Sequence, residues 1–165
     1  MHPYLEVCIV RMIAAPSIEY NMLTGVTGAQ AGTLSFLVGG GETSFLQARP
    51  ILELMGRRII HCGSSGAGLG AKICNNLVLG VQQIVVGEAM LLGRKLGLDP
   101  AVLAGVINSS TGSCWASSVN NPVPSSLPDK TPPCEKDYEG GFATALMLKV
   151  RRCIQCARWC GDLSR

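Results

Sequence analysis

One uninterrupted stretch, residues 71–96, constrains the fold of this chain more than any other part of the sequence. It contains no proline and few charged residues. At about 1.5 Å of rise per residue, a helix of this length extends roughly 39 Å. Apolar residues occupy nearly every side of such a helix, which is typical of a helix buried between other layers. We therefore predict one long helix, ended by Gly97 as its C-cap.

The start of this predicted helix carries the strongest candidates for chemistry, Lys72 and Asn76. A lysine in the first turn faces the positive end of the helix dipole, which should lower the pKa of Lys72 toward the range useful for proton transfer. Asn76 follows four residues later, on the same side of the helix. The preceding glycine-rich turn, residues 63–70, would let the backbone approach a ligand closely. The alternative is that Lys72 is a solvated cation with an apolar stem.

By its sequence alone, the same turn also matches a dinucleotide-binding fingerprint. Residues 57–62 are typical of a strand, and residues 66–71 (GAGLGA) match G-x-G-x-x-A. The fingerprint would require a second parallel strand that ends in an acidic residue. Glu88 has a suitable spacing, but it falls inside the predicted long helix. We therefore favour an active-site turn over a dinucleotide loop.

Short strands are predicted before the long helix. Apolar runs at residues 34–38 and 58–62 indicate two strands, and residues 44–55 between them indicate a helix. This order is typical of the last part of an α/β domain with a parallel sheet.

Only helices and loops are predicted after the long helix. Asp99 and Pro100 are typical of an N-cap and a first helical residue, so we expect a second helix through residue 108. The proline-rich residues 120–136 exclude regular structure and are typical of either a surface connector or a lid over a cleft. A further helix is expected at residues 138–149.

Several motifs together resemble the 3-hydroxyisobutyrate dehydrogenase family. They are residues 70–76 (GAKICNN), 87–90 (GEAM), 96–100 (LGLDP), 114–115 (CW), 121–124 (NPVP) and 140–142 (GGF). The CW and NPVP motifs favour this family over other β-hydroxyacid dehydrogenases. The resemblance implies an N-terminal Rossmann domain that binds NAD, and a long helix that leads into an all-helical domain with a catalytic lysine.

The resemblance also implies roles for four residues. Lys72 matches the family's catalytic lysine, which assists proton transfer at the substrate hydroxyl while hydride moves to the nicotinamide. Asn76 matches an asparagine that contacts the substrate. Gly25 is the residue that agrees with the family's substrate loop, D-A-P-V-S-G-G. Lys149, at the end of the LMLK motif, matches a lysine that helps to bind NAD.

The sequence departs from the family pattern in two places near its start. Leu23 replaces the serine that would bind the substrate carboxylate, and leucine has no hydrogen-bond donor to offer. Nothing before residue 20 combines a strand, a glycine fingerprint and a helix, so the NAD-binding front half of the family is missing from this sequence. The expected fold class is therefore an α/β remnant, the last strands of a Rossmann domain, followed by an all-α domain led by one long helix.

These departures divide the sequence into four expected segments. They are a divergent arm (1–24), the Rossmann remnant (25–63), an incomplete helical dehydrogenase domain (64–149) and a cysteine-rich tail outside the family pattern (150–165). One hypothesis for the tail is translation past an exon boundary between Lys149 and Val150, which a comparison of genomic and transcript sequences would test. Four cysteines have a spacing that suggests zinc or an iron–sulfur cluster: Cys134, Cys153, Cys156 and Cys160. No second C-x-x-C or histidine pair accompanies them, so we expect no metal site.

Composition limits the function classes. A net charge of +3 with 15% charged residues gives no basic surface for nucleic acid. Amides at residues 75, 76, 82 and 83 interrupt the long helix, so we expect no membrane span. The eight cysteines lack a preceding signal peptide, which favours a reducing compartment. The family is mitochondrial, yet Arg11 is the only basic Lys or Arg side chain among residues 1–20, so no transit peptide is visible.

Three functions remain open. The first is an NAD-dependent oxidation of 3-hydroxyisobutyrate to methylmalonate semialdehyde, in valine breakdown, with Lys72 and Asn76 at the chemistry. The second is a truncated and catalytically silent chain. The third is an interaction module that associates with the full-length dehydrogenase, because the family's helical domains form homo-oligomers. The altered substrate loop leaves the choice of small 3-hydroxy acid open, and the sequence does not decide between NAD and NADP.

Overall fold

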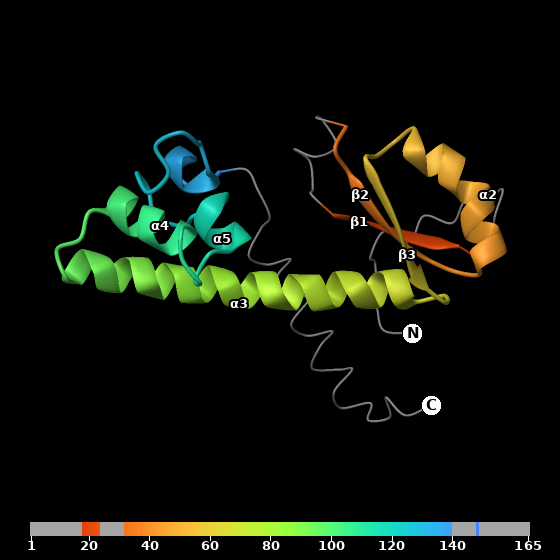
Figure 1. Ribbon diagram of the computed structural model, residues 1–165, viewed down its shortest axis with the longest axis horizontal. Coiled ribbons are helices and arrows are strands. Elements are labelled where there is room, and N and C mark those ends of the chain that lie inside the picture. Colours follow the sequence, from red (N-terminus) through yellow and green to blue (C-terminus); the bar gives the residue numbers. More distant parts are fainter. Residues whose placement is uncertain (1–17, 24–31, 140–147, 149–165) are drawn as a thin grey trace, which may run out of the picture. The chain divides into compact units, whose positions relative to one another are not determined.

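The computed structural model describes residues 18–23, 32–139 and 148, and these divide into two compact units. The first unit includes the described residues up to Asn75, and the second runs from Asn76 to Met147. The fold class predicted from the sequence is confirmed, because a short sheet precedes one long helix and a helical region (Figure 1). Gly25 and Lys149, two of the predicted site residues, lie outside the described residues.

The first unit is built on a three-stranded sheet in the order β1-β2-β3. β1 (Glu19–Leu23) is antiparallel to β2 (Ser35–Gly39), and β2 is parallel to β3 (Arg58–Gly63). The strands predicted at 34–38 and 58–62 are confirmed to within one residue. β1 was not predicted, although it alternates apolar and polar residues as a half-buried strand does.

Helix α2 (Glu42–Glu53) joins β2 to β3 and packs on one face of the sheet (Figure 1). Apolar residues from β1, β2 and α2 form one buried cluster there: Ile18, Tyr20, Leu34, Phe36, Val38, Phe45, Ala48 and Leu52. The rings of Tyr20 and Phe36 meet edge to face at 5.5 Å, a favoured aromatic geometry. Burial raises the pKa of Tyr20 above its ordinary value, because it disfavours the charged form.

Helix α3 (Ala67–Lys95) confirms the prediction of one long helix, but it begins four residues earlier than expected. Gly97 ends it in a left-handed conformation (φ 78°), and the amide of Leu98 donates to the Gly93 carbonyl at 3.0 Å. By length and composition alone α3 could cross a membrane, but the core helix of a soluble protein passes the same test. The expected absence of a membrane span therefore stays a prediction.

The second unit packs short elements against the later turns of α3. Helix α4 (Pro100–Asn108) begins as predicted, since the Asp99 carboxylate accepts the amides of Ala101 and Val102 at 2.9 and 3.0 Å. Helix α5 (Trp115–Ser118) and the 3₁₀ helix η1 (Pro133–Lys136) follow. A second buried cluster joins α3, α4, α5 and the loop after α5: Val86, Met90, Ala104, Ala116, Val123 and Leu127.

Two predictions for the end of this unit are wrong. Residues 120–136 were expected to hold no regular structure, but they include η1. Asp137 and Tyr138 have positive φ values of 51° and 62°, so no helix begins at residue 138. Most of the helix predicted at 138–149 lies outside the described residues.

Candidate active site

The first turn of α3 rests directly on β2, because neither backbone carries a side chain at the contact. A Cβ on Gly68 would lie 2.7 Å from the Leu37 carbonyl oxygen, and one on Gly39 would lie 2.9 Å from the Ser64 carbonyl oxygen. Real Cβ atoms do not come so close to another backbone, so only glycine fits. The glycine-rich turn thus brings α3 against the sheet.

Lys72 follows Gly68 by four residues, so it lies one turn further along the helix face that is turned toward the sheet. It is half-buried. The prediction that Lys72 lies in the first turn is wrong, because residues 67–70 are already helical and place it in the second turn. The helix dipole acts mainly within the first turn, so its field at Lys72 is weaker than the sequence suggested.

Asn76, with which the second unit begins, follows Lys72 by one turn of the same helix. Its side chain is buried, with 8% of the residue exposed, whereas the neighbouring Asn75 is exposed. Most buried amides in folded proteins are hydrogen-bonded. The continuous helix therefore keeps the spacing of the two predicted site residues.

The carboxyl ends of β2 and β3 are held together by a histidine that the sequence analysis did not select. His61 Nε2 lies 2.8 Å from the Gly40 carbonyl oxygen, and the Gly40 amide donates to the Gly63 carbonyl at 2.9 Å. The imidazole stacks on Phe45 at 4.6 Å between ring centroids. Ligands of open α/β sheets bind at this edge, so His61 orders the backbone beside a typical ligand position.

The described residues contain only part of what a dinucleotide needs. One parallel crossover is present, β2-α2-β3, and α2 begins with Glu42 where a phosphate-binding helix would offer free amides. A carboxylate there repels a pyrophosphate. Glu88, the residue that the fingerprint would have required on a strand, lies within α3. Within the described residues, the pyrophosphate part of a dinucleotide site is therefore incomplete.

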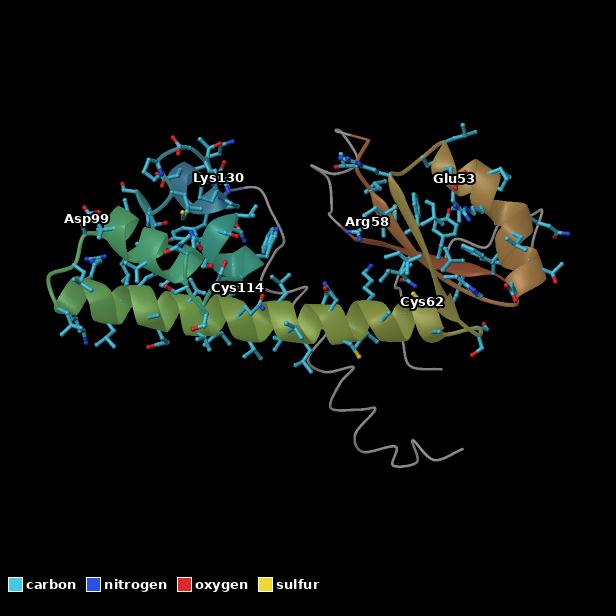
Figure 2. The ribbon with its side chains drawn as sticks, viewed as in Figure 1. Glu53, Arg58, Cys62, Asp99, Cys114 and Lys130 are labelled. Atoms are coloured by element: carbon cyan, nitrogen blue, oxygen red, sulfur yellow. The ribbon has the colours of Figure 1, made fainter. Side chains whose placement is uncertain are left out.

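Cys134 has a structural environment. Its thiol donates a hydrogen bond of 3.1 Å to the Asn121 carbonyl, and burial together with nearby Glu135 raises the pKa of Cys134. The other cysteines of the predicted cluster, Cys153, Cys156 and Cys160, lie outside the described residues. Figure 2 shows two further cysteines, Cys62 at the end of β3 and Cys114 before α5, in different units.

Comparison with known proteins agrees with this architecture. Residues 66–159, more than half of the chain, match a family model described as "NAD-binding of NADP-dependent 3-hydroxyisobutyrate dehydrogenase". Residues 13–63 match the NAD binding domain of 6-phosphogluconate dehydrogenase. The fold and these matches define a class, the dehydrogenases that use NAD(P). Within that class, the chain belongs to the 3-hydroxyisobutyrate dehydrogenase family.

Individual relatives support this assignment. They also show what share of a relative's length this chain covers. It is 54% identical over 125 residues to a probable 3-hydroxyisobutyrate dehydrogenase of Mycobacterium tuberculosis, covering 76% of this chain and 42% of the relative. The mitochondrial enzyme of Drosophila melanogaster is 50% identical, with 80% and 40% covered. The solved M. tuberculosis enzyme with L-serine superposes with a TM-score of 0.80 at 46% identity, covering 88% of this chain and 50% of that one. The chain thus spans half or less of the length of these proteins.

Proposed function

We propose that the chain provides the substrate side of an NAD-dependent 3-hydroxyisobutyrate dehydrogenase, which forms methylmalonate semialdehyde in valine breakdown. The observation that carries this proposal is the placement of Lys72 and Asn76 one turn apart on α3. Lys72 takes the proton of the substrate hydroxyl, and Asn76 donates a hydrogen bond that orients the substrate. NAD, when bound, accepts the hydride from the carbon that bears this hydroxyl.

The remaining assignments extend the same proposal. Gly25 lies at the substrate and Lys149 at the cofactor, as the family motifs imply. A small 3-hydroxy acid is the substrate, although Leu23 lacks the donor of the family's serine, so carboxylate binding there is weakened. A mitochondrial location is proposed because the Drosophila relative carries that word in its name.

Turnover of 3-hydroxyisobutyrate tests the proposed roles. Lys72→Ala should lower kcat by at least about a hundredfold, the usual range for loss of a general acid or base. Lys95→Ala, in the last turn of the same helix, is the matched control and should leave kcat unchanged. Asn76→Ala should raise KM, while Asn75→Ala, at an exposed neighbour, should not. Equal rates for Lys72→Ala and Lys95→Ala would contradict the proposal.

A second candidate is a catalytically silent chain, and it is favoured by the incomplete dinucleotide site of the described residues. Hydride transfer needs a positioned nicotinamide. Calorimetric titration of the purified chain with NAD separates the two candidates. No heat of binding and no turnover would support a silent chain, and tight binding with turnover that depends on Lys72 would exclude it.

The silent chain could still act by association, because α3 offers an apolar surface within the second unit. Large apolar side chains of α3 are exposed there: Leu77, Val78, Val81, Ile84, Val85, Leu91 and Leu92. A patch of this kind is typical of a protein interface. We propose that it contacts the helical domain of a second family member, in a homo-oligomer or with the full-length enzyme. Sedimentation of Ile84→Lys should show loss of association, whereas the control Asp129→Lys, at an exposed residue of the proline-rich loop outside α3, should not.

A further inference from the structure

The most unusual side chain of the first unit is Asn21, at the centre of β1. Only 1% of the residue is exposed, and neither Nδ2 nor Oδ1 has a hydrogen-bond partner among the described residues. Most buried amides in folded proteins are paired, so such a group calls for a physical explanation.

The side chain of Asn21 points away from the apolar cluster under α2. Ile18 and Tyr20 belong to that cluster, and side chains alternate along a strand, so Glu19 and Asn21 lie on the opposite face. That face carries the first turn of α3, since Gly68 meets the carbonyl of Leu37, the residue opposite Asn21 in the ladder. Asn21 is therefore enclosed on the face of the sheet that supports the helix with Lys72.

Glu19 shares this face and is also incompletely paired, since its Oε1 is buried with no hydrogen-bond partner among the described residues. This oxygen and the Gly68 amide nitrogen both lie close to Gly39, since a Cβ on Gly39 would be 2.9 Å from the first and 3.1 Å from the second. The positive end of α3 partly offsets the burial of this carboxylate. Asn21 is neutral and gains nothing comparable.

The second unit contains an equally buried asparagine whose side-chain amide is hydrogen-bonded. Asn121 is also 1% exposed, but its Nδ2 donates to the Ser117 carbonyl at 3.3 Å and its Oδ1 accepts the Val123 amide at 3.1 Å. An unpaired amide opposes burial, because water satisfies it as soon as the segment that carries it is released. β1 is at the edge of the described sheet and pairs with β2 alone among its strands, so release breaks a single ladder.

We propose that β1, at the edge of the sheet formed by the described residues, is a detachable strand. It exchanges between a docked and a released state because the unpaired amide of Asn21 weakens the docked one. Release uncovers the sheet face beneath the first turn of α3.

Hydrogen exchange tests whether β1 is released in this way. It is measured on the wild-type chain and on the variants Asn21→Leu and Asn121→Leu. In the wild type, the β1 amides bonded to β2 should exchange at least about tenfold faster than those of the β2–β3 ladder, since one unpaired buried group shifts such an equilibrium by about this factor. Asn21→Leu should slow exchange in β1 by about tenfold and leave β3 unchanged. Asn121→Leu should leave β1 unchanged and speed exchange in α5.

Equal protection of β1 and β3 in the wild type would overturn the proposal. So would an Asn21→Leu variant whose β1 exchanges as fast as before. A variant that fails to fold would also overturn it, because that result would mean the amide is required in the docked state.

Discussion

The two units of this chain stabilise their irregular segments in different ways. In the first unit, the turn into α3 is fixed by close backbone contact, with Gly68 against Leu37 and Gly39 against Ser64. In the second unit, side chains hold the loops by hydrogen bonds to the backbone, from Asp99, Gln83, Ser117, Asn121, Lys130 and Tyr138. Figure 2 shows Asp99 before α4 and Lys130 in the proline-rich loop. A backbone contact of this kind leaves no space for an added methyl group. Loss of one side-chain hydrogen bond lowers the free energy of unfolding by a smaller amount.

The largest effect is expected where the backbones touch. Gly68→Ala should destabilise the chain by about 2–3 kcal/mol, because the new methyl group meets a backbone carbonyl that cannot move without the strand. Gly70→Ala is the matched control, since a Cβ there meets nothing within 4 Å and alanine favours a helix by about 0.5–1 kcal/mol. Urea unfolding followed by circular dichroism checks both. A Gly68→Ala chain as stable as Gly70→Ala would refute the backbone contact.

The next effect is expected at the buried amide of the second unit. Asn121→Leu should lower the free energy of unfolding by about 2 kcal/mol, because it leaves the Val123 amide and the Ser117 carbonyl without this partner. The same substitution at Asn21 should be neutral or stabilising, since no described partner is lost. Urea midpoints of the two variants test the contrast, and destabilisation of equal size at both positions would remove it.

A smaller loss is expected at the helix cap. Asp99→Ala removes the acceptor of two amides at the start of α4 and should cost about 1 kcal/mol. Asp99→Asn should retain most of this stability, because asparagine is an equally good N-cap. Thermal unfolding of the three chains checks the order. If alanine and asparagine behaved alike, the cap would have no role.

The smallest effect should be a gain. Ser125 has a φ of 63°, a region that favours glycine, and its amide donates to Glu135 Oε1 at 2.6 Å. Ser125→Gly removes the conformational strain and keeps the hydrogen bond, so it should stabilise the chain by about 0.5 kcal/mol. Ser126→Gly is the control and should destabilise, because the buried Ser126 hydroxyl donates to the Val123 carbonyl at 2.6 Å. A lower urea midpoint for Ser125→Gly would argue against strain at this residue.

Local patterns were enough to predict β2, β3, α2 and α4 to within two residues. The start of α3 was misplaced because glycine disfavours helices, and the sequence could not reveal that Gly68 is required by contact with β2. β1 was missed although its alternation was visible, because its residues depart from the family's substrate loop. Lys72 and Asn76 were selected as candidates from their position at the start of the long helix and were then matched to the family motifs. The sequence alone could not show the contact that orients α3 against the sheet.

Chemical rescue of Lys72→Ala tests the central claim most directly, namely that the amine of Lys72 transfers the substrate proton. Turnover of 3-hydroxyisobutyrate is measured with added small primary amines of different basicity. We predict that the amines restore part of the lost rate in this variant, in proportion to their concentration and basicity, and leave Lys95→Ala unchanged. An inactive Lys72→Ala chain that no amine rescues, while retaining its stability and substrate affinity, would contradict the account.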